Sequence, residues 1–357
     1  MKYTLILHVG MHKTGTSSIQ QTLAKFYGQP TKEIVYFNFD GIINHSCIVY
    51  PIFLENPYSY RDYGLMNLSF MERHSSIQYL QKTFFTTIKN QRRPISIISG
   101  EDISLLSEKE LENLKDFLQN FFHEIKVIAY VREPYSFLSS YFQEIVRGLG
   151  YKQFKLYSEW IDYKNIFIKF YNVFGEENVF LFRFDPKRDV VLHFCQIFDI
   201  PIEPQQTLRI YEGCTKEAIQ ILYLYNKSLP DYKQNNIVLG WIPSKDSIKR
   251  RLVIRSIVEK IGKIKFRIHK HVLDPIVNEK TNEIEWIEER LKEPLIKEGE
   301  LKHFLSKECV KSEIDLLNIN KETIQELKDK IFEIFGKDDK ERIAKILNLL
   351  YQVIQVT

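Results

Sequence analysis

Residues 5–23, LILHVGMHKTGTSSIQQTL, constrain the fold of this chain more than any other part of its sequence. A mostly apolar run leads into a short loop with two glycines, Gly10 and Gly15, and an amphipathic stretch follows. Glycines let the backbone curl so that successive N–H groups point inward, and the N-terminus of a helix adds partial positive charge. The segment therefore predicts a buried strand, an anion-binding loop and a helix. A plain strand-to-helix turn is the simpler explanation.

The side chains of this loop indicate which kind of anion it holds. Thr16, Ser17 and Ser18 place hydroxyls at the start of the predicted helix, and Lys13 adds an ammonium group. In the loop that binds ATP or GTP, GxxxxGK[ST], the lysine follows the second glycine. Here that position is Thr16, and the lysine lies two residues before Gly15. This spacing places the positive charge where it can meet a bridging or leaving-group oxygen without a metal ion.

Short β-branched runs alternate with amphipathic stretches over the first half of the chain, which is typical of a parallel sheet covered by helices. The sequence predicts strands over residues 3–9, 34–37, 95–99, 127–131 and 179–182. Most of them are apolar on both faces, as expected of strands that are buried on both sides. We therefore expect an α/β fold, P-loop-like and three-layered, with a central, mostly parallel sheet of about five strands.

Helix ends are also indicated by the sequence. An apolar stripe predicts a helix from about residue 17, and Ser107 with Glu110 predicts a capping box ahead of another. Asp185 and Pro186 predict the N-cap and first turn of a helix that continues to about residue 198.

Strand signals fade after about residue 239, so we expect a core over residues 1–239 and a helical C-terminal region over 240–357. Two helical patterns close the chain, near 322–335 and 340–354. Residues 245–271 contain ten lysines or arginines against Asp246 and Glu259, whereas the whole chain carries a formal charge of only +4. A solvated helix face explains this basic segment, and so does attraction to an anionic acceptor or to a membrane surface bearing a lipid-linked glycan.

A second pattern lies after the fourth predicted strand, in VIAYVREPYSFLSSYFQEIVRG. Arg132 follows the strand, Pro134 fits a first helical turn, and Ser140 lies eight residues after the arginine. A guanidinium at a strand end can hold a phosphate through two hydrogen bonds. By itself Arg132 is equally well explained as a structural ion-pair residue.

The two patterns together resemble a known family. HKTGTS is similar to the 5′-phosphosulfate loop of sulfotransferases that use 3′-phosphoadenosine 5′-phosphosulfate (PAPS), approximately KxGT[ST], and Arg132 with Ser140 is similar to the family's pair for the 3′-phosphate. The resemblance covers roughly residues 3–230 and is nearest to bacterial carbohydrate sulfotransferases with an HKTGT loop. It implies that PAPS binds, without a metal ion, to His12, Lys13, Thr14, Gly15, Thr16, Ser17, Ser18, Arg132 and Ser140.

The resemblance implies transfer of a sulfuryl group from PAPS to a hydroxyl of a carbohydrate or glycoconjugate, leaving 3′,5′-adenosine bisphosphate. Lys13 is the expected catalytic cation at the bridging oxygen. Glu101, at the end of a predicted strand, is the first candidate for the base, because related enzymes carry Glu or His at the end of the comparable strand. His45 is the second candidate, since an imidazole is a good base near pH 7. A turn cap at Glu101 and a structural role for His45 are the simpler explanations.

Two other classes of function compete with this interpretation. A P-loop kinase or NTPase would use Asp102 to hold a metal ion, but the missing lysine after Gly15 argues against it. A non-catalytic nucleotide-binding module would dock on a glycan or membrane through its basic segment.

Composition narrows the choice further. The small net charge argues against nucleic acid as the partner. Four widely spaced cysteines fit a reducing compartment, and no apolar run reaches the ~20 residues of a membrane helix, so we expect a cytoplasmic protein.

Overall fold

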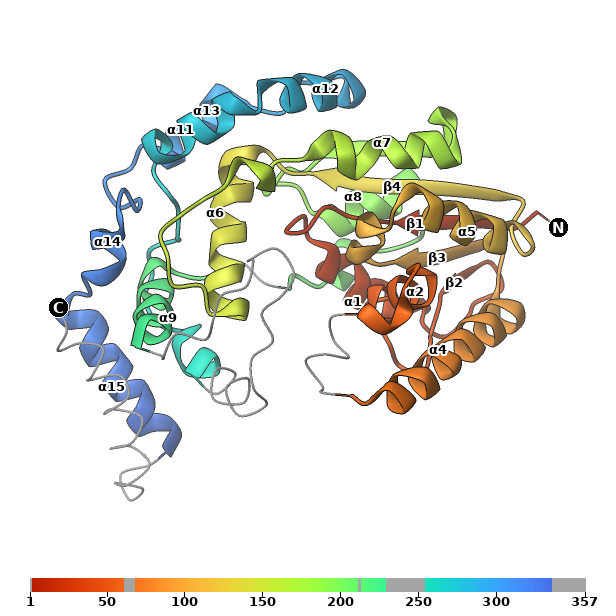
Figure 1. Ribbon diagram of the computed structural model, residues 1–357, viewed down its shortest axis with the longest axis horizontal. Helices are drawn as coiled ribbons and strands as arrows, with labels where there is room; N and C mark the ends of the chain where they lie inside the picture. Colours follow the sequence, from red (N-terminus) through yellow and green to blue (C-terminus); the bar gives the residue numbers. More distant parts are fainter. Residues whose placement is uncertain (1, 61–67, 211–212, 229–253, 336–357) are drawn as a thin grey trace. The chain divides into compact units, whose positions relative to one another are not determined.

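The computed structural model describes residues 2–60, 68–210, 213–228 and 254–335 (Figure 1). By their packing, the residues divide into two compact units. The first comprises Met1–Glu133, Asp162–Glu212 and Asn282–Leu295, and the second comprises Pro134–Ile161, Gly213–Thr281 and Ile296–Thr357. The predicted division of the chain at residue 239 stays a prediction.

The first unit contains a five-stranded, all-parallel sheet in the order β2-β3-β1-β4-β5. Its strands are β1 (Thr4–His8), β2 (Ile34–Tyr36), β3 (Ile95–Ser99), β4 (Glu124–Val131) and β5 (Val179–Arg183). Its α-helices are α1 (Thr16–Tyr27), α2 (Ser46–Phe53), α4 (Phe70–Gln91), α5 (Glu108–Gln119), α7 (Tyr163–Phe174), α8 (Val190–Ile197) and nearly all of α12 (Thr281–Leu291). Short 3-10 helices are η1 (Pro57–Ser59), η2 (Glu101–Leu105), η5 (Glu176–Asn178) and η6 (Pro204–Gln206). This architecture confirms the predicted α/β fold with a parallel sheet.

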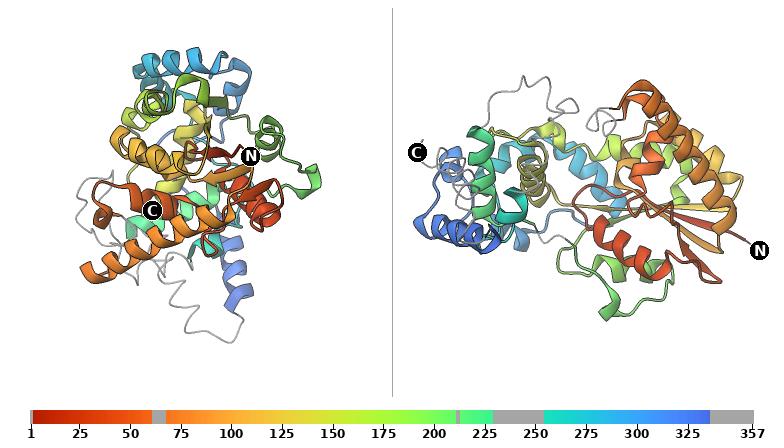
Figure 2. Two further views of the ribbon diagram at one scale, coloured as in Figure 1. Left: turned by 90° about the vertical axis from the view of Figure 1, so that its right-hand side faces the viewer. Right: turned by 90° about the horizontal axis from the view of Figure 1, so that it is seen from below.

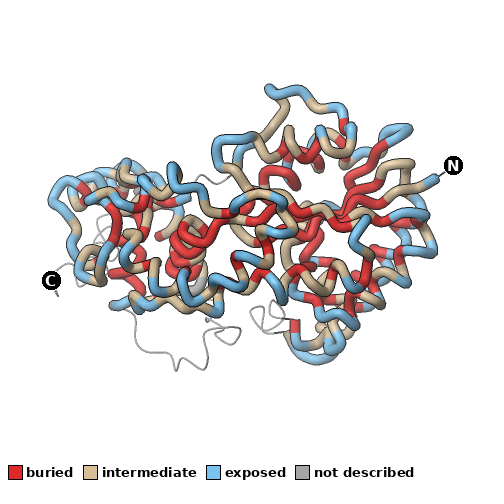
Figure 3. Tube along the Cα trace, turned by 90° about the horizontal axis from the view of Figure 1, so that it is seen from above, coloured by how far each residue is buried: buried red, intermediate tan, exposed pale blue. Residues whose placement is uncertain are grey.

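Helices cover both faces of the sheet (Figure 2). On one face, Ile6 and Ile128 of the strands pack with Leu23 of α1 and Phe194 of α8. On the other face, α5 and α7 contact β4, and α2 contacts α4 and α5. The central strand β1 is therefore buried on both sides, as its apolar sequence predicts (Figure 3).

The segments that follow β1 and β3 leave the sheet at the carboxyl ends of these neighbouring strands. His8, the last residue of β1, is in register with Ser99, the last residue of β3. The N–H of Gly100 donates to the carbonyl of His8 (3.0 Å), and the N–H of Val9 donates to the carbonyl of Ile128 in β4 (3.0 Å). The segment after β1 and the segment after β3 therefore begin side by side at the carboxyl ends of the strands, where open α/β folds bind their ligands.

One predicted helix start is confirmed and one is wrong. Ser107 forms the predicted capping box with Glu110 at the start of α5. The helix predicted to start at Asp185 and Pro186 begins instead at Val190, because the carboxylate of Asp189 accepts from the backbone N–H groups of Val191 and Leu192 (2.9 and 3.1 Å). Asp185 closes a short turn of its own.

The second unit is helical in the part that the structure describes. It contains α6 (Pro134–Glu144), the π-helical turn η3 (Ile145–Leu149), η4 (Ser158–Trp160), α9 (Lys216–Ser228), α11 (Lys270–Glu279), α13 (Glu298–Leu301), η7 (Lys302–Phe304), α14 (Glu313–Leu317) and α15 (Lys321–Phe335). Phe142 of α6 is fully buried and stacks on Phe266 at a centroid distance of 5.9 Å. As predicted, Pro134 begins a helix and a helix covers residues 322–335.

The basic segment 245–271 is only partly described. Lys245, Lys249, Arg250 and Arg251 lie outside the described residues, as does the helix predicted near 340–354. In the described part, the apolar side chains between the charges are buried, namely Ile254, Ile257, Val258 and Ile261, while Lys260, Lys263 and Lys265 are exposed. Residues 254–258 are helical, whereas the three exposed lysines lie in the turns and the β-bridge that follow this helix. Among the described helices, none combines the length and the apolar character that crossing a membrane requires.

Candidate functional site

The loop between β1 and α1 has an unusual backbone. Gly10, Lys13 and Gly15 all have positive φ, at 32°, 69° and 83°. Left-handed residues placed among right-handed ones make successive N–H groups converge, which creates a concave anion site. The carbonyl of Gly15 then accepts from the N–H groups of Ser18 and Ile19, so α1 begins at the end of the loop. The loop thus has the form that an anion cradle at a helix N-terminus requires.

The hydroxyls of the loop divide into two groups. Thr16 is buried, and its Oγ1 has no hydrogen-bond partner among the described residues. This oxygen lies 2.8 Å from the point where a Cβ on Gly10 would stand, so it faces the loop. In contrast, Thr14 Oγ1 donates to the carbonyl of Met11 (2.5 Å), which is a contact within the loop itself.

Ser17 and Ser18 have different surroundings. Ser18 Oγ accepts from the N–H of Ile210 (3.0 Å), whereas Ser17 is half-buried. A buried polar atom without a partner is costly in a folded protein unless something else binds it. Thr16 is therefore the hydroxyl of this loop whose oxygen is left for a ligand to bind, and the ligand roles of all four residues stay predictions.

Arg132 follows β4 and reaches the loop. Its Nη1 donates to the carbonyl of Lys13 (2.7 Å), and its guanidinium lies 5.6 Å from the ring centroid of Phe184. The hydroxyl of Tyr163 donates to the Arg132 carbonyl (2.9 Å). Burial lowers the pKa of Arg132 to about 10, so the side chain stays charged at neutral pH. Ser140 is half-buried on α6 in the second unit, and its pairing with Arg132 stays a prediction.

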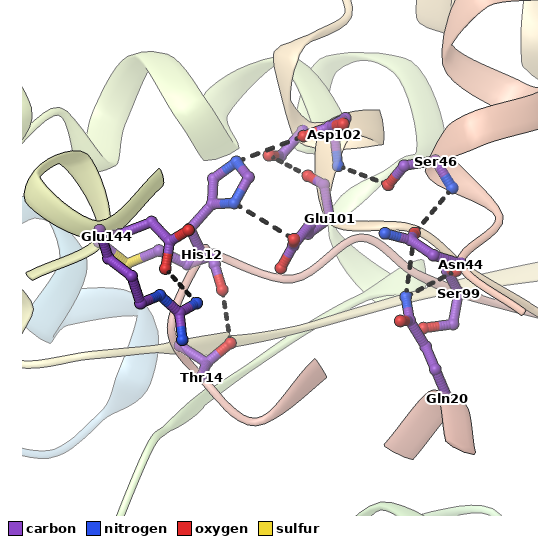
Figure 4. A network of polar contacts seen from close by, with 12 residues as sticks. His12, Thr14, Gln20, Asn44, Ser46, Ser99, Glu101, Asp102 and Glu144 are labelled. Atoms are coloured by element: carbon purple, nitrogen blue, oxygen red, sulfur yellow. Dashed lines mark hydrogen bonds and ion pairs between the residues drawn. The ribbon is translucent and has the colours of Figure 1, made fainter. Parts of the chain in front are cut away.

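The structure brings His12, Glu101 and Asp102 together (Figure 4). His12 Nδ1 lies 3.5 Å from Glu101 Oε1, and His12 Nε2 lies 3.5 Å from Asp102 Oδ1. Burial alone would lower the pKa of His12, but the hydrogen bond to Glu101 and the charges of Glu101 and Asp102 raise it above 6.5. An imidazole of the loop itself is thus held between two carboxylates, where β1 and β3 end.

Sequence reasoning identified these three residues singly but missed the cluster. His12 was expected at the anion, Glu101 as a base and Asp102 as a metal ligand of a rival function. Their meeting depends on β1 and β3 being neighbours in the sheet, although about ninety residues separate them. The signal that the sequence does contain is that His12 and Glu101 each follow closely on a predicted strand.

A set of backbone and side-chain hydrogen bonds fixes the turn that carries the two carboxylates (Figure 4). The N–H of Asp102 donates to Ser46 Oγ (2.9 Å), and the N–H of Ser46 donates to Asn44 Oδ1 (3.0 Å). Gln20 of α1 donates to the same oxygen of Asn44 (3.2 Å). A Cβ on Gly100 would lie 2.6 Å from the nitrogen of Ser46, so only glycine fits there. The turn after β3 is therefore packed closely and held in one position.

His45 is fully buried among the backbone groups around this turn. Its Nε2 donates to the carbonyl of Phe37 (2.9 Å), and its Nδ1 accepts from the N–H of Ser99 (3.0 Å). Burial lowers the pKa of His45 to about 3. Both nitrogens of His45 are thus engaged by the protein, which favours its structural explanation over its role as the base.

His8 is also neutral, because burial lowers its pKa to about 4. Its Nδ1 bonds to Ser99 Oγ (2.8 Å), while its Nε2 has no partner among the described residues. That Nε2 lies 3.6 Å from the point where a Cβ on Gly10 would stand. A second unpaired buried polar atom therefore lies beside the loop.

Comparisons with known proteins add little beyond this geometry. No family model matches the sequence, and no curated protein matches it. Among solved structures, the chain is similar to the "Sulfotransferase Domain from the Curacin Biosynthetic Pathway". The two share 14% identity with a TM-score of 0.31, over 78% of this chain and 96% of that chain. At that distance the activity has to be argued from the residues of this chain.

Proposed function

We propose that the protein is a PAPS-dependent sulfotransferase that transfers a sulfuryl group to a hydroxyl of a carbohydrate or glycoconjugate. The observation that carries the proposal is the arrangement around Gly10. The buried, unpaired hydroxyl of Thr16 lies on one side, and the Cβ of Glu101 lies 3.8 Å from the point where a Cβ on Gly10 would stand. A site for an anion and a carboxylate that can take a proton are thus adjacent.

The residues of the site have separate roles in this proposal. The acceptor oxygen forms a bond to sulfur while the bond from sulfur to the bridging phosphate oxygen breaks, and 3′,5′-adenosine bisphosphate leaves. Lys13 stabilises the charge that develops on the bridging oxygen. Thr16 and the loop N–H groups hold the other oxygens of the 5′-phosphosulfate, those of the phosphate included. Glu101 accepts the proton of the attacking hydroxyl, and His12 orients that carboxylate through its 3.5 Å contact.

The surroundings of Asp102 support this proposal over a kinase or NTPase. In such an enzyme the carboxylate after this strand would hold a metal ion beside the phosphates. Here it lies 3.5 Å from His12 Nε2, and the raised pKa of His12 favours its protonated, cationic form. The position after Gly15 is a threonine, where such an enzyme has its lysine.

The proposal of a carbohydrate acceptor has two supports. It is supported by the HKTGT resemblance and by the exposed lysines of the basic segment, which suit an anionic polysaccharide. A cytoplasmic location and contact with a lipid-linked glycan at a membrane surface belong to the same proposal.

The binding part of the proposal is tested by calorimetry with 3′,5′-adenosine bisphosphate and, separately, with ATP and magnesium. We expect bisphosphate to bind with micromolar affinity, on the order of −8 kcal/mol, and more tightly than magnesium-ATP. Thr16→Val should weaken bisphosphate binding by roughly 1.5–3 kcal/mol, because a hydrogen bond to a charged group is lost. Thr87→Val, the same change at a buried position of α4, should leave it unaltered. Preferred binding of magnesium-ATP would revive the NTPase.

The base is tested by transfer of labelled sulfuryl from PAPS to a panel of soluble polysaccharides. Glu101→Gln should lower turnover by roughly 10²–10⁴-fold while bisphosphate affinity is unchanged, because a general base contributes about that much. Glu108→Gln, an exposed acid on α5, should behave like the wild type. If Glu101→Gln keeps its turnover and a folded His45→Asn loses it, the two roles must be exchanged.

A further inference from the structure

Two side chains hold the loop after β1 in shape. Thr14 Oγ1 donates to the carbonyl of Met11, and Arg132 Nη1 donates to the carbonyl of Lys13 (2.5 and 2.7 Å). The first bond closes the loop on itself. The second comes from the residue that directly follows β4, the strand paired with β1. Arg132 therefore ties the top of the loop to the sheet.

The carbonyl that Arg132 holds belongs to a residue in an unfavourable conformation. Lys13 has φ 69°, in the left-handed region that a residue with a Cβ rarely adopts. The peptide bond between Lys13 and Thr14 is trans, as are all others in the described residues, so the Lys13 C=O and the Thr14 N–H point in opposite directions. A rotation of this peptide that relaxed Lys13 would break the bond to Arg132. The same bond therefore fixes the direction of the Thr14 N–H.

Arg132 is itself firmly placed. Its carbonyl accepts from the hydroxyl of Tyr163, which is fully buried, and its guanidinium lies over the ring of Phe184. A hydrogen bond from a charged donor is shorter and stronger than one between neutral groups. A charged donor on a rigid support is what is needed to hold a strained peptide in one orientation.

We propose that Arg132 is a positioning residue that keeps the loop of residues 10–16 in its anion-binding conformation before any nucleotide binds. This role is separate from the 3′-phosphate contact considered above. It deepens the proposed function, because a loop that is already ordered loses less freedom on binding and keeps its N–H groups aimed as charge develops.

Hydrogen exchange on the full, ligand-free chain tests the positioning role directly. Arg132→Met removes the donors but keeps much of the side-chain volume, and we expect the amides of residues 10–16 to exchange about tenfold faster or more. The amides of β5 and α8 should be unchanged. Arg188→Met is the matched control, since it removes the same groups from an exposed position, and it should leave loop exchange as in the wild type.

Nucleotide binding then separates positioning from direct contact. Arg132→Met should weaken the binding of adenosine 5′-monophosphate, which lacks the 3′-phosphate, as well as that of 3′,5′-adenosine bisphosphate. Arg132→Lys can still donate one bond to the Lys13 carbonyl, so it should restore part of the loop protection. If Arg132→Met does not fold, Arg132→Lys and Arg188→Lys provide the same comparison.

Unchanged loop exchange, with a binding loss confined to the bisphosphate, would overturn the proposal and leave Arg132 as a ligand only. The proposed function fails in a different way. If the wild type binds neither nucleotide while Arg132→Met still speeds loop exchange, the positioning role stands and the sulfotransferase assignment falls.

Discussion

His12 shows how much a single residue gains from its neighbours. At the level of sequence it is one more polar residue of a glycine loop, expected to donate to an anion. In the fold it lies within 3.5 Å of two carboxylates that come from the segment after β3. The imidazole of His12 therefore orients the carboxylate of Glu101 and, when protonated, balances the negative charge of both acids.

The raised pKa of His12 makes a prediction about stability and pH. Since the pKa is higher in the folded than in the unfolded chain, protonated His12 stabilises the fold. This contribution is fully present below about pH 6.5 and is lost as the pH rises through the folded-state pKa. In urea unfolding, the wild type should therefore lose more stability than His12→Gln between about pH 6 and pH 9.

The neutral histidines do not disturb this comparison. His8 and His45 have lowered pKa values and destabilise the fold at acid pH, but they are the same in both proteins and cancel in the difference. A difference between wild type and His12→Gln that stays flat, or grows with rising pH, would contradict the account of His12.

At the scale of elements, the loop and α8 fit together closely. A Cβ on Gly15 would lie 2.7 Å from Val190 Cγ1, at the start of α8. The φ of 83° at Gly15 is also one that glycine alone adopts readily. The second glycine of the loop therefore serves two purposes, the turn into α1 and the approach of α8.

A pair of glycine substitutions separates these purposes. Gly41 has nearly the same φ, 82°, but a Cβ there would meet nothing within 4 Å. Gly41→Ala should cost about 1–2 kcal/mol of unfolding free energy from backbone strain alone. Gly15→Ala should cost roughly a further 1–3 kcal/mol from overpacking, and Val190→Ala in the same chain should recover part of it. Equal losses at the two glycines, measured by urea unfolding, would contradict the packing argument.

Elements were predicted best where local chemistry decides them. The strand over 95–99 matches β3, and the loop and the start of α1 follow from their glycines and hydroxyls. The predicted start of α8 was wrong because two acids, Asp185 and Asp189, can each cap a helix. Sequence spacing does not indicate which of the two backbone N–H sets will be aligned with a carboxylate.

At the scale of the whole molecule, the order of the strands in the sheet determines which loops meet at the site. The strand patterns along the sequence do not show which strands are neighbours. The neighbours β1, β3 and β4 bring together loops from three distant parts of the chain. Sequence motifs predicted Lys13, Glu101 and Arg132 as site residues, but they did not predict the hydrogen bond from Arg132 to the Lys13 carbonyl. It also treated Thr14, Thr16 and Ser18 alike, although the fold uses two of these hydroxyls internally.

The account depends on the loop of residues 10–16 holding the 5′ end of an adenosine bisphosphate. The most direct test is a crystal structure with 3′,5′-adenosine bisphosphate bound. We expect the 5′-phosphate within hydrogen-bond distance of Thr16 Oγ1 and the loop N–H groups, with Lys13 next to the oxygen that carried the sulfur and Glu101 beyond it, on the side from which the acceptor hydroxyl attacks. A bisphosphate bound elsewhere, with Thr16 Oγ1 still unpaired, would contradict the account.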